Sequence, residues 1–168
     1  MKSTSLATYA LFPAAFLLGI LAGGVVYSHV AFFPAYLADL PHSAVVVTGK
    51  YGINEAPFWL ALHPLLLLSL LAALVLNWKF LARRKLIALS LGIYAAVLAA
   101  SALYFIPELF AFAESAGSTL PDAAWAARSQ RWLTLSHIRG AFCLLAFVVI
   151  LAALAKPQVT APAKSPGT

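Results

Sequence analysis

Ionisable side chains interrupt the long apolar stretches of this 168-residue chain, and they are the residues that could do chemistry. Charged and titratable groups are expensive inside a membrane, so each one found there is a candidate functional residue. An imidazole can exchange a proton near neutral pH, and a guanidinium, which stays charged, requires an anion. The candidates are His29, His63, Glu108, His137 and Arg139.

Four apolar stretches must position these side chains, and each is long enough to cross a bilayer, which takes about 20 residues. They cover about residues 6–40, 57–78, 86–113 and 132–155. Hydrophobic residues make up 63% of the chain and charged residues 10%, which leaves too little polar surface for a soluble particle. We therefore expect an all-α, four-helix transmembrane bundle over residues 1–156, without an internal repeat, and a disordered cytoplasmic tail over residues 157–168. Residues 123–130 favour helix and are expected to run into the fourth stretch.

The lysines and arginines predict the orientation of the bundle, because cytoplasmic loops are enriched in them. The loop between the second and third stretches is strongly basic. Its side of the membrane carries Lys2, Lys79, Arg83, Arg84, Lys85, Lys156 and Lys164, whereas the other side carries Lys50, Arg128 and Arg131. We expect a multi-pass protein of the cell inner membrane with both termini in the cytoplasm (N-in/C-in).

The net charge of +6 is accounted for by these cations at the span ends, where they meet anionic lipid. The lipid bilayer, and not nucleic acid, is therefore the expected partner. Cys143 is the only cysteine, so no disulfide within the chain is expected, and no motif predicts a metal or a cofactor. Gly19 and Gly23 in the first stretch would let two helices pack closely, which makes a second copy of the chain a candidate partner.

The candidate residues are expected at a similar depth, toward the outer side of the membrane. His29 lies about 23 residues, or roughly 35 Å, along the first stretch, and Glu108 lies near the outer end of the third. His63 and Arg139 lie about one to two turns inside the outer ends of the second and fourth. Because Glu108 is the only acid well inside a stretch, we expect it to pair with Arg139. His137 is rotated by about 160° from Arg139 around the helix and is expected to point elsewhere.

Aromatic side chains at the same depth would line a pocket for a flat, lipophilic aromatic molecule. Those expected to bind it are Phe33, Trp59, Tyr104 and Trp132. The same residues also have simpler interpretations. Tryptophans are typical of the belt at the membrane–water interface, histidines near a span end can simply be hydrated, and a Glu108–Arg139 pair can be a purely structural clamp.

Two segments of the chain carry a more specific pattern. Residues 104–108 read Y-F-I-P-E, residues 132–139 read W-L-T-L-S-H-I-R, and the first stretch ends in the aromatic–proline segment Phe32-Phe33-Pro34. In this pattern, and in the order of its four spans, the chain resembles the bacterial anthrone oxygenase-like membrane proteins. That family often has Asn two residues before the arginine, where this chain has His137, and it varies at the position of Glu108.

The resemblance implies an oxidoreductase that converts an anthrone to an anthraquinone without a cofactor. Such a reaction requires a base to remove an acidic C–H, a cation or hydrogen-bond donor to hold the resulting anion, and direct reaction of that anion with O2. It implies that Arg139 holds the anion and that a histidine is the base. We rank His29 and His63 above His137 as this base, because His137 points away from the face of Arg139.

Two other functions are compatible with the sequence. Two histidines from neighbouring stretches, His63 with either His29 or His137, could ligate a haem in a haem- or quinone-binding membrane protein. Alternatively, the chain is a non-catalytic accessory subunit, or a small transporter controlled by protonation of Glu108.

The predicted orientation can be tested at Ser118, in the segment between the third and fourth stretches. In a Ser118→Cys variant, a membrane-impermeant maleimide added outside intact cells should label the new cysteine. The native chain, whose only cysteine is Cys143, is the control. Labelling from the cytoplasmic side alone would contradict the N-in/C-in topology and place the polar residues in the other half of the membrane.

Overall fold

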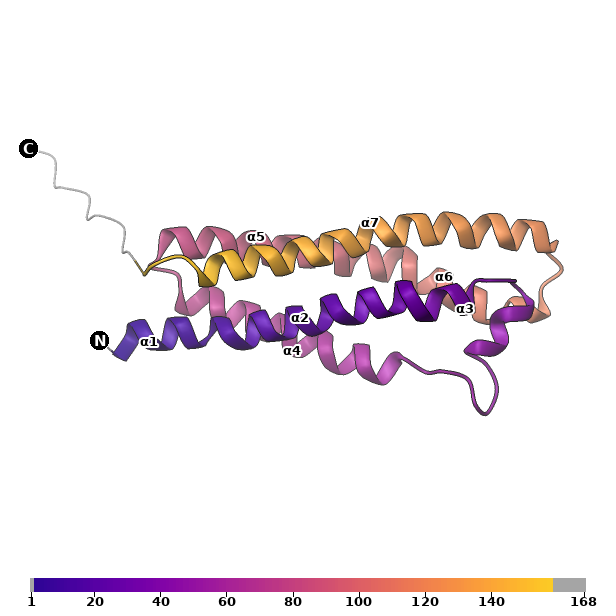
Figure 1. Cartoon of the computed structure of the whole chain (residues 1–168), viewed down its shortest axis with the longest axis horizontal. Helices are drawn as coiled ribbons and strands as arrows, with labels where there is room; N and C mark the ends of the chain where they lie inside the picture. Colours follow the sequence, from indigo (N-terminus) through magenta and orange to yellow (C-terminus); the bar gives the residue numbers. More distant parts are fainter. Residues whose placement is uncertain (1, 159–168) are drawn as a thin grey trace, which may run out of the picture.

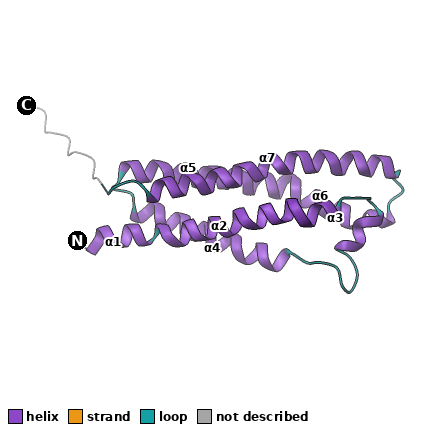
Figure 2. Cartoon of the chain, viewed as in Figure 1, coloured by secondary structure: helices purple, strands orange, loops and turns teal. Residues whose placement is uncertain are grey.

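The computed structural model describes residues 2–158, and its regular elements are all helical (Figures 1 and 2). In chain order they are α1 (Lys2–Tyr9), α2 (Leu11–Tyr27), η1 (Ser28–Phe32), α3 (Phe33–Tyr36), η2 (His42–Val46), α4 (Ala56–Leu76), α5 (Leu81–Ala100), η3 (Ser101–Phe105), α6 (Ile106–Ala113), η4 (Ser115–Gly117) and α7 (Asp122–Leu154). The segments long and apolar enough to cross a membrane are Leu6–Tyr36, Ala56–Leu76, Leu81–Ala113 and Asp122–Leu154. The predicted all-α, four-helix transmembrane bundle is confirmed, whereas the predicted disordered tail lies, from residue 159 on, outside the described residues.

The four spans lie side by side, and consecutive spans run in opposite directions (Figure 1). One end of the bundle, which we call the terminal end, holds α1, the end of α7 and the turn between α4 and α5. The other end, the loop end, holds α3, α6 and the segments around η2 and η4. Lys2 and the end of α7 therefore lie on one side of the membrane. The assignment of that side to the cytoplasm stays a prediction.

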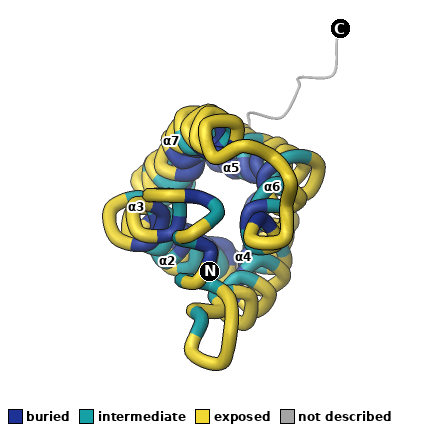
Figure 3. Tube along the Cα trace, turned by 90° about the vertical axis from the view of Figure 1, so that its right-hand side faces the viewer, coloured by how far each residue is buried: buried dark blue, intermediate teal, exposed yellow. Residues whose placement is uncertain are grey.

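Two hydrophobic clusters of different character fill the bundle. Small and aliphatic side chains such as Leu18, Leu66 and Ala146, all fully buried, pack α2, α4, α5 and α7 together. Aromatic rings, among them Phe105 and Trp132, pack the loop end. Figure 3 looks along the bundle from the loop end and shows the buried segments turned inward and the exposed ones outward. Most outward side chains of the spans are apolar, so the outer surface of the bundle is suited to contact lipid rather than water.

Two spans extend beyond the stretches predicted from hydropathy. α5 begins at Leu81 rather than at about residue 86, and it includes the buried Arg83. That side chain donates from Nε to the backbone carbonyl of Lys156 (2.8 Å) and from Nη1 to Oγ1 of Thr8 (2.9 Å), which joins three spans at the terminal end. α7 begins at Asp122, as expected from the helix-forming residues that precede the fourth stretch.

A π-helical turn interrupts the first and third spans near the loop end. The two turns are η1 and η3, and a proline follows each of them in the next helix, at Pro34 and Pro107. Proline has no N–H to donate to the carbonyl four residues earlier, so the regular helical ladder is broken there. The extra residue in a π turn redirects the side chains around it, and such turns are frequent at functional sites.

The two π turns belong to a repeat within the chain, where the sequence analysis expected none. Residues 18–34 read LGILAGGVVYSHVAFFP, and residues 91–107, which lie 73 positions later, read LGIYAAVLAASALYFIP. The same offset relates Trp59 in α4 to Trp132 in α7. In the structure α2 packs on α4 as α5 packs on α7, and α2 contacts α7 as α5 contacts α4. The bundle therefore consists of two similar helix pairs side by side, as expected for parallel repeats in a membrane protein.

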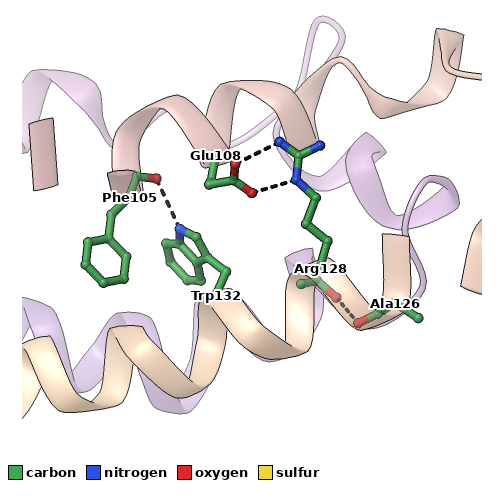
Figure 4. Close-up of polar contacts among 6 residues, drawn as sticks. Phe105, Glu108, Ala126, Arg128 and Trp132 are labelled. Atoms are coloured by element: carbon green, nitrogen blue, oxygen red, sulfur yellow. Dashed lines mark hydrogen bonds and ion pairs between the residues drawn. The ribbon is translucent and has the colours of Figure 1, made fainter. Parts of the chain in front are cut away.

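Trp132 joins the two spans of the second helix pair at the π turn. Its side chain is fully buried, and Nε1 donates to the backbone carbonyl of Phe105 at 3.1 Å (Figure 4). Trp125, about two turns earlier on α7, is also buried, and both indole rings lie 6.2 Å from the ring of Phe112. The Nε1 of Trp125, however, has no hydrogen-bond partner among the described residues.

The variant Trp132→Phe should destabilise the protein by about 0.5–1.5 kcal/mol more than Trp125→Phe, because it removes a buried hydrogen bond between two spans. Unfolding of both variants in mixed micelles of increasing SDS content measures the difference. Both variants replace a buried indole by a smaller phenyl ring, so Trp125→Phe controls for the loss of packing. Equal destabilisation would contradict a structural role for the Trp132 hydrogen bond.

Candidate functional site

Polar side chains from all four spans meet where the two hydrophobic clusters adjoin. We call them the central polar cluster, which consists of His29, His63, Tyr94, Ser101, Ser136 and Arg139. Hydrogen bonds link four of its members through Arg139, and the other two form a bonded pair, His63 with Tyr94. Both cluster histidines also interact electrostatically with the guanidinium. The charge of Arg139 is thus the centre of the site.

The guanidinium of Arg139 is held by neutral groups. Nη1 donates to Oγ of Ser101 at 3.1 Å, and Nη2 donates to Oγ of Ser136 at 3.0 Å. Its central carbon lies 4.2 Å from the ring centre of Phe105, a cation–π contact. The ion pairs found within residues 2–158 are His42–Asp39 and Arg128–Glu108, and neither involves Arg139. Arg139 is half-buried, and a cation in such a place without a carboxylate partner is suited to hold an anionic ligand.

The predicted Glu108–Arg139 pair is wrong, because Glu108 pairs with Arg128 instead (Figure 4). The two side chains form a bidentate bridge, with Nε to Oε2 at 2.6 Å and Nη2 to Oε1 at 2.8 Å. α7 continues beyond Arg139 to Asp122 at the loop end, and it carries Arg128, about three turns from Arg139, alongside α6. Glu108 therefore lies at the loop end, outside the central polar cluster, and leaves Arg139 without an acid.

His29 is oriented by two hydrogen bonds. Nδ1 lies 2.7 Å from the backbone carbonyl of Val25, and Nε2 lies 3.1 Å from Oγ of Ser136. A carbonyl can only accept, so Nδ1 carries the hydrogen and Nε2 of the neutral ring accepts from the serine hydroxyl. Ser136 in turn accepts from Arg139. A side chain at Gly140 would crowd both Val25 and the His29 ring, at 3.1 and 3.5 Å from its Cβ, so the glycine permits this close approach.

His63 approaches the cluster from α4. Its Nδ1 lies 2.8 Å from the hydroxyl of Tyr94, and that hydroxyl also donates to the His63 backbone carbonyl at 3.3 Å. The imidazole stacks on the indole of Trp59, with ring centres 5.8 Å apart and an angle of 20° between the planes. His63 is therefore fixed between a tyrosine in the core and a tryptophan near the surface.

His137 is exposed on α7, and its ring contacts His29 with centres 4.7 Å apart. Its Nδ1 lies 2.8 Å from the Leu133 carbonyl. No contact joins it to Arg139 among the described residues, in line with the predicted rotation. Within residues 2–158, no group of three or more His, Cys, Asp or Glu side chains is arranged to hold a metal ion.

The aromatic residues predicted to bind substrate fall into two groups. Phe33 lies edge-on to both His29 (5.2 Å) and Trp132 (4.8 Å), and Trp59 stacks on His63, so these three border the central polar cluster. Tyr104 packs against Phe105 and interacts electrostatically with Arg128, which places it with the Glu108 bridge at the loop end.

Sequence reasoning missed several residues of the site. Ser101 and Ser136 lie on the polar helix faces of the third and fourth spans, but they carry no charge and were not selected. Tyr94 lies seven residues before Ser101, a helical spacing that places it on the same face. A search for hydroxyl groups at helical spacing from the charged residues would have found all three.

No family model, curated protein or solved structure matches this chain. The resemblance to anthrone oxygenase-like proteins and the alternative functions therefore stay hypotheses.

The Glu108–Arg128 bridge predicts a specific pattern of coupling between substitutions. Glu108→Gln and Arg128→Gln should be coupled by on the order of 1 kcal/mol in SDS unfolding, because the bridge is bidentate but partly exposed. Glu108→Gln and Arg139→Gln should be additive, because the two side chains belong to separate networks. Coupling of Glu108 to Arg139 and not to Arg128 would restore the pair that the sequence suggested.

Proposed function

We propose that this multi-pass membrane protein binds a flat, weakly acidic aromatic molecule at the central polar cluster and oxygenates it without a cofactor. The observation that carries the proposal is the Arg139 guanidinium, whose described partners are hydroxyl groups and aromatic rings rather than a carboxylate. A charge in an apolar interior is costly unless it is compensated, and an anionic ligand would compensate it. The resemblance in residues 104–108 and 132–139 adds the reaction class, anthrone oxygenation.

In the proposed reaction His29 is the base and Arg139 stabilises the anion. Nε2 of His29, once released by the Ser136 hydroxyl, accepts a proton from the methylene carbon of an anthrone. Arg139 stabilises the negative charge that develops on the substrate oxygen. O2 adds at the deprotonated carbon, and the proton returns to the oxygen adduct to give a hydroperoxide. Loss of water then leaves a carbonyl, so anthrone and O2 become anthraquinone and water.

The positions of the other groups support this assignment. Ser136 connects base and cation, since it contacts His29 at 3.1 Å and Arg139 at 3.0 Å. Phe33, edge-on to His29, provides an apolar wall of the kind that a flat ring requires. His29 rather than His63 is assigned as the base, because the Nδ1 of His63 is bonded to Tyr94 and its ring is stacked on Trp59.

Oxygen consumption by the purified protein in lipid nanodiscs, with dithranol as the anthrone, tests the proposal. His29→Gln should lower kcat by about 100-fold and Arg139→Gln by about 100-fold or more. His42→Gln is the matched control, because the His42 side chain is exposed and pairs with Asp39, outside the central polar cluster, and it should keep the native rate. Circular dichroism establishes that each variant is folded.

Two results would contradict the proposal in different ways. A native rate no higher than that of empty nanodiscs, with dithranol and with related hydroquinones, would eliminate the oxygenase function. A native rate that both His29→Gln and Arg139→Gln retain would leave the function but eliminate the central polar cluster as its site.

A further inference from the structure

A groove on the outer surface of the first helix pair lies next to the central polar cluster. It has a volume of about 450 Å³, within the range of small-molecule sites. Its lining is almost entirely apolar, with one carboxylate. The lining residues are Ile20, Gly23, Gly24, Tyr27, Glu55, Phe58 and Trp59.

Trp59 forms both a wall of the groove and a contact of the cluster, since its indole stacks on His63. The floor is open because it is built from glycines. A side chain at Gly24 would approach Trp59 and Phe58 at 3.1 and 3.2 Å from its Cβ, whereas a side chain at Gly23 would meet nothing within 4 Å. The space above Gly23 is therefore free, and Trp59 lies between this groove and His63 of the central polar cluster.

The carboxylate of Glu55 is the polar feature of the groove. It accepts from the hydroxyl of Ser28 and from Nε1 of Trp59, each at the long distance of 3.4 Å. An ionised carboxylate offers about four acceptor positions, so it can accept a further, shorter bond from a neutral hydroxyl. It would repel an anion. The groove thus complements the neutral, hydroxyl-bearing form of a flat aromatic, whereas Arg139 complements its anion.

We propose that the groove is the entry site at which a neutral phenolic aromatic docks from the bilayer, with its hydroxyl on Glu55 and its ring against Trp59 and Phe58. The inference rests on the proposed function, because it supplies the same substrate class to the central polar cluster. It also restricts that class: the substrate carries a phenolic hydroxyl in addition to the acidic carbon that reacts.

Photolabelling of the protein in phosphatidylcholine nanodiscs tests the entry site. The probe is β-naphthol that carries a diazirine, and the labelled residues are located by mass spectrometry. Label should concentrate on residues 20–27 and 55–59, and excess β-naphthol should suppress it. The methyl ether of β-naphthol, which has the same ring but no donor, should compete at least about tenfold less well, since a site that accepts a hydrogen bond discriminates against ligands without one.

Two glycine variants provide a matched pair. Gly23→Leu places a side chain in the groove and should reduce the competed label by about tenfold or more. Gly92→Leu is the control, because Gly92 is also an exposed helical glycine whose Cβ would meet nothing within 4 Å, and it lies outside the groove. Leucine has a higher helix propensity than glycine, so neither change should unfold the protein.

The entry site would be overturned if Gly23→Leu left the label unaffected, or if the label spread over lipid-facing residues without competition. The groove would then be a surface that contacts lipid acyl chains. Equal competition by the methyl ether would overturn the role of Glu55 and the phenolic substrate class. Competed label confined to the α7 segment around Arg139 would overturn the groove while the proposed function stands. Competed label at neither place would overturn both.

Discussion

A positive charge that cannot be discharged, inside a bundle of apolar helices, is the constraint on which the rest of the site depends. Two serine hydroxyls and the face of Phe105 surround the Arg139 guanidinium, and each stabilises a cation without neutralising it. The acid that could neutralise it, Glu108, is occupied by Arg128 in a separate bridge at the loop end. The structure therefore keeps a charge available for a ligand, and it does so through the placement of a second arginine.

The internal repeat explains how the site is assembled and why only one of the two helix pairs carries its cation. The 73-residue offset relates His63 in the first helix pair to Ser136 in the second, and each of these positions makes a polar contact with the other pair. It relates Arg139 to Leu66, so only the second pair carries the cation. The two π turns begin at Ser28 and Ser101, which contact Glu55 and Arg139 respectively. A symmetric scaffold thus holds an asymmetric centre.

The sequence was sufficient to predict the bundle, because four long apolar stretches with charged ends permit few alternatives. It also placed His29, His63 and Arg139 at a common depth, which the structure brings together around one charge. The Glu108–Arg139 pair failed because Arg128 entered the prediction only as a cation that sets the orientation, whereas its place on the predicted helical extension lets it bind the same acid. The π turns were not predicted, because a proline indicates a disturbed ladder but not the way in which the backbone accommodates it.

The proposed function depends on Arg139 holding the anionic form of an aromatic ligand. Absorption spectra of para-nitrophenol bound to the protein in nanodiscs, recorded across a pH titration, measure this directly because the phenol and phenolate absorb at different wavelengths. If Arg139 holds the anion, the pKa of the bound phenol is lower on the native protein than on Arg139→Gln. Arg128→Gln, which removes a cation already paired with Glu108, leaves that pKa at the native value. The same pKa of the bound phenol on the native protein and on Arg139→Gln would show that Arg139 does not hold the anion.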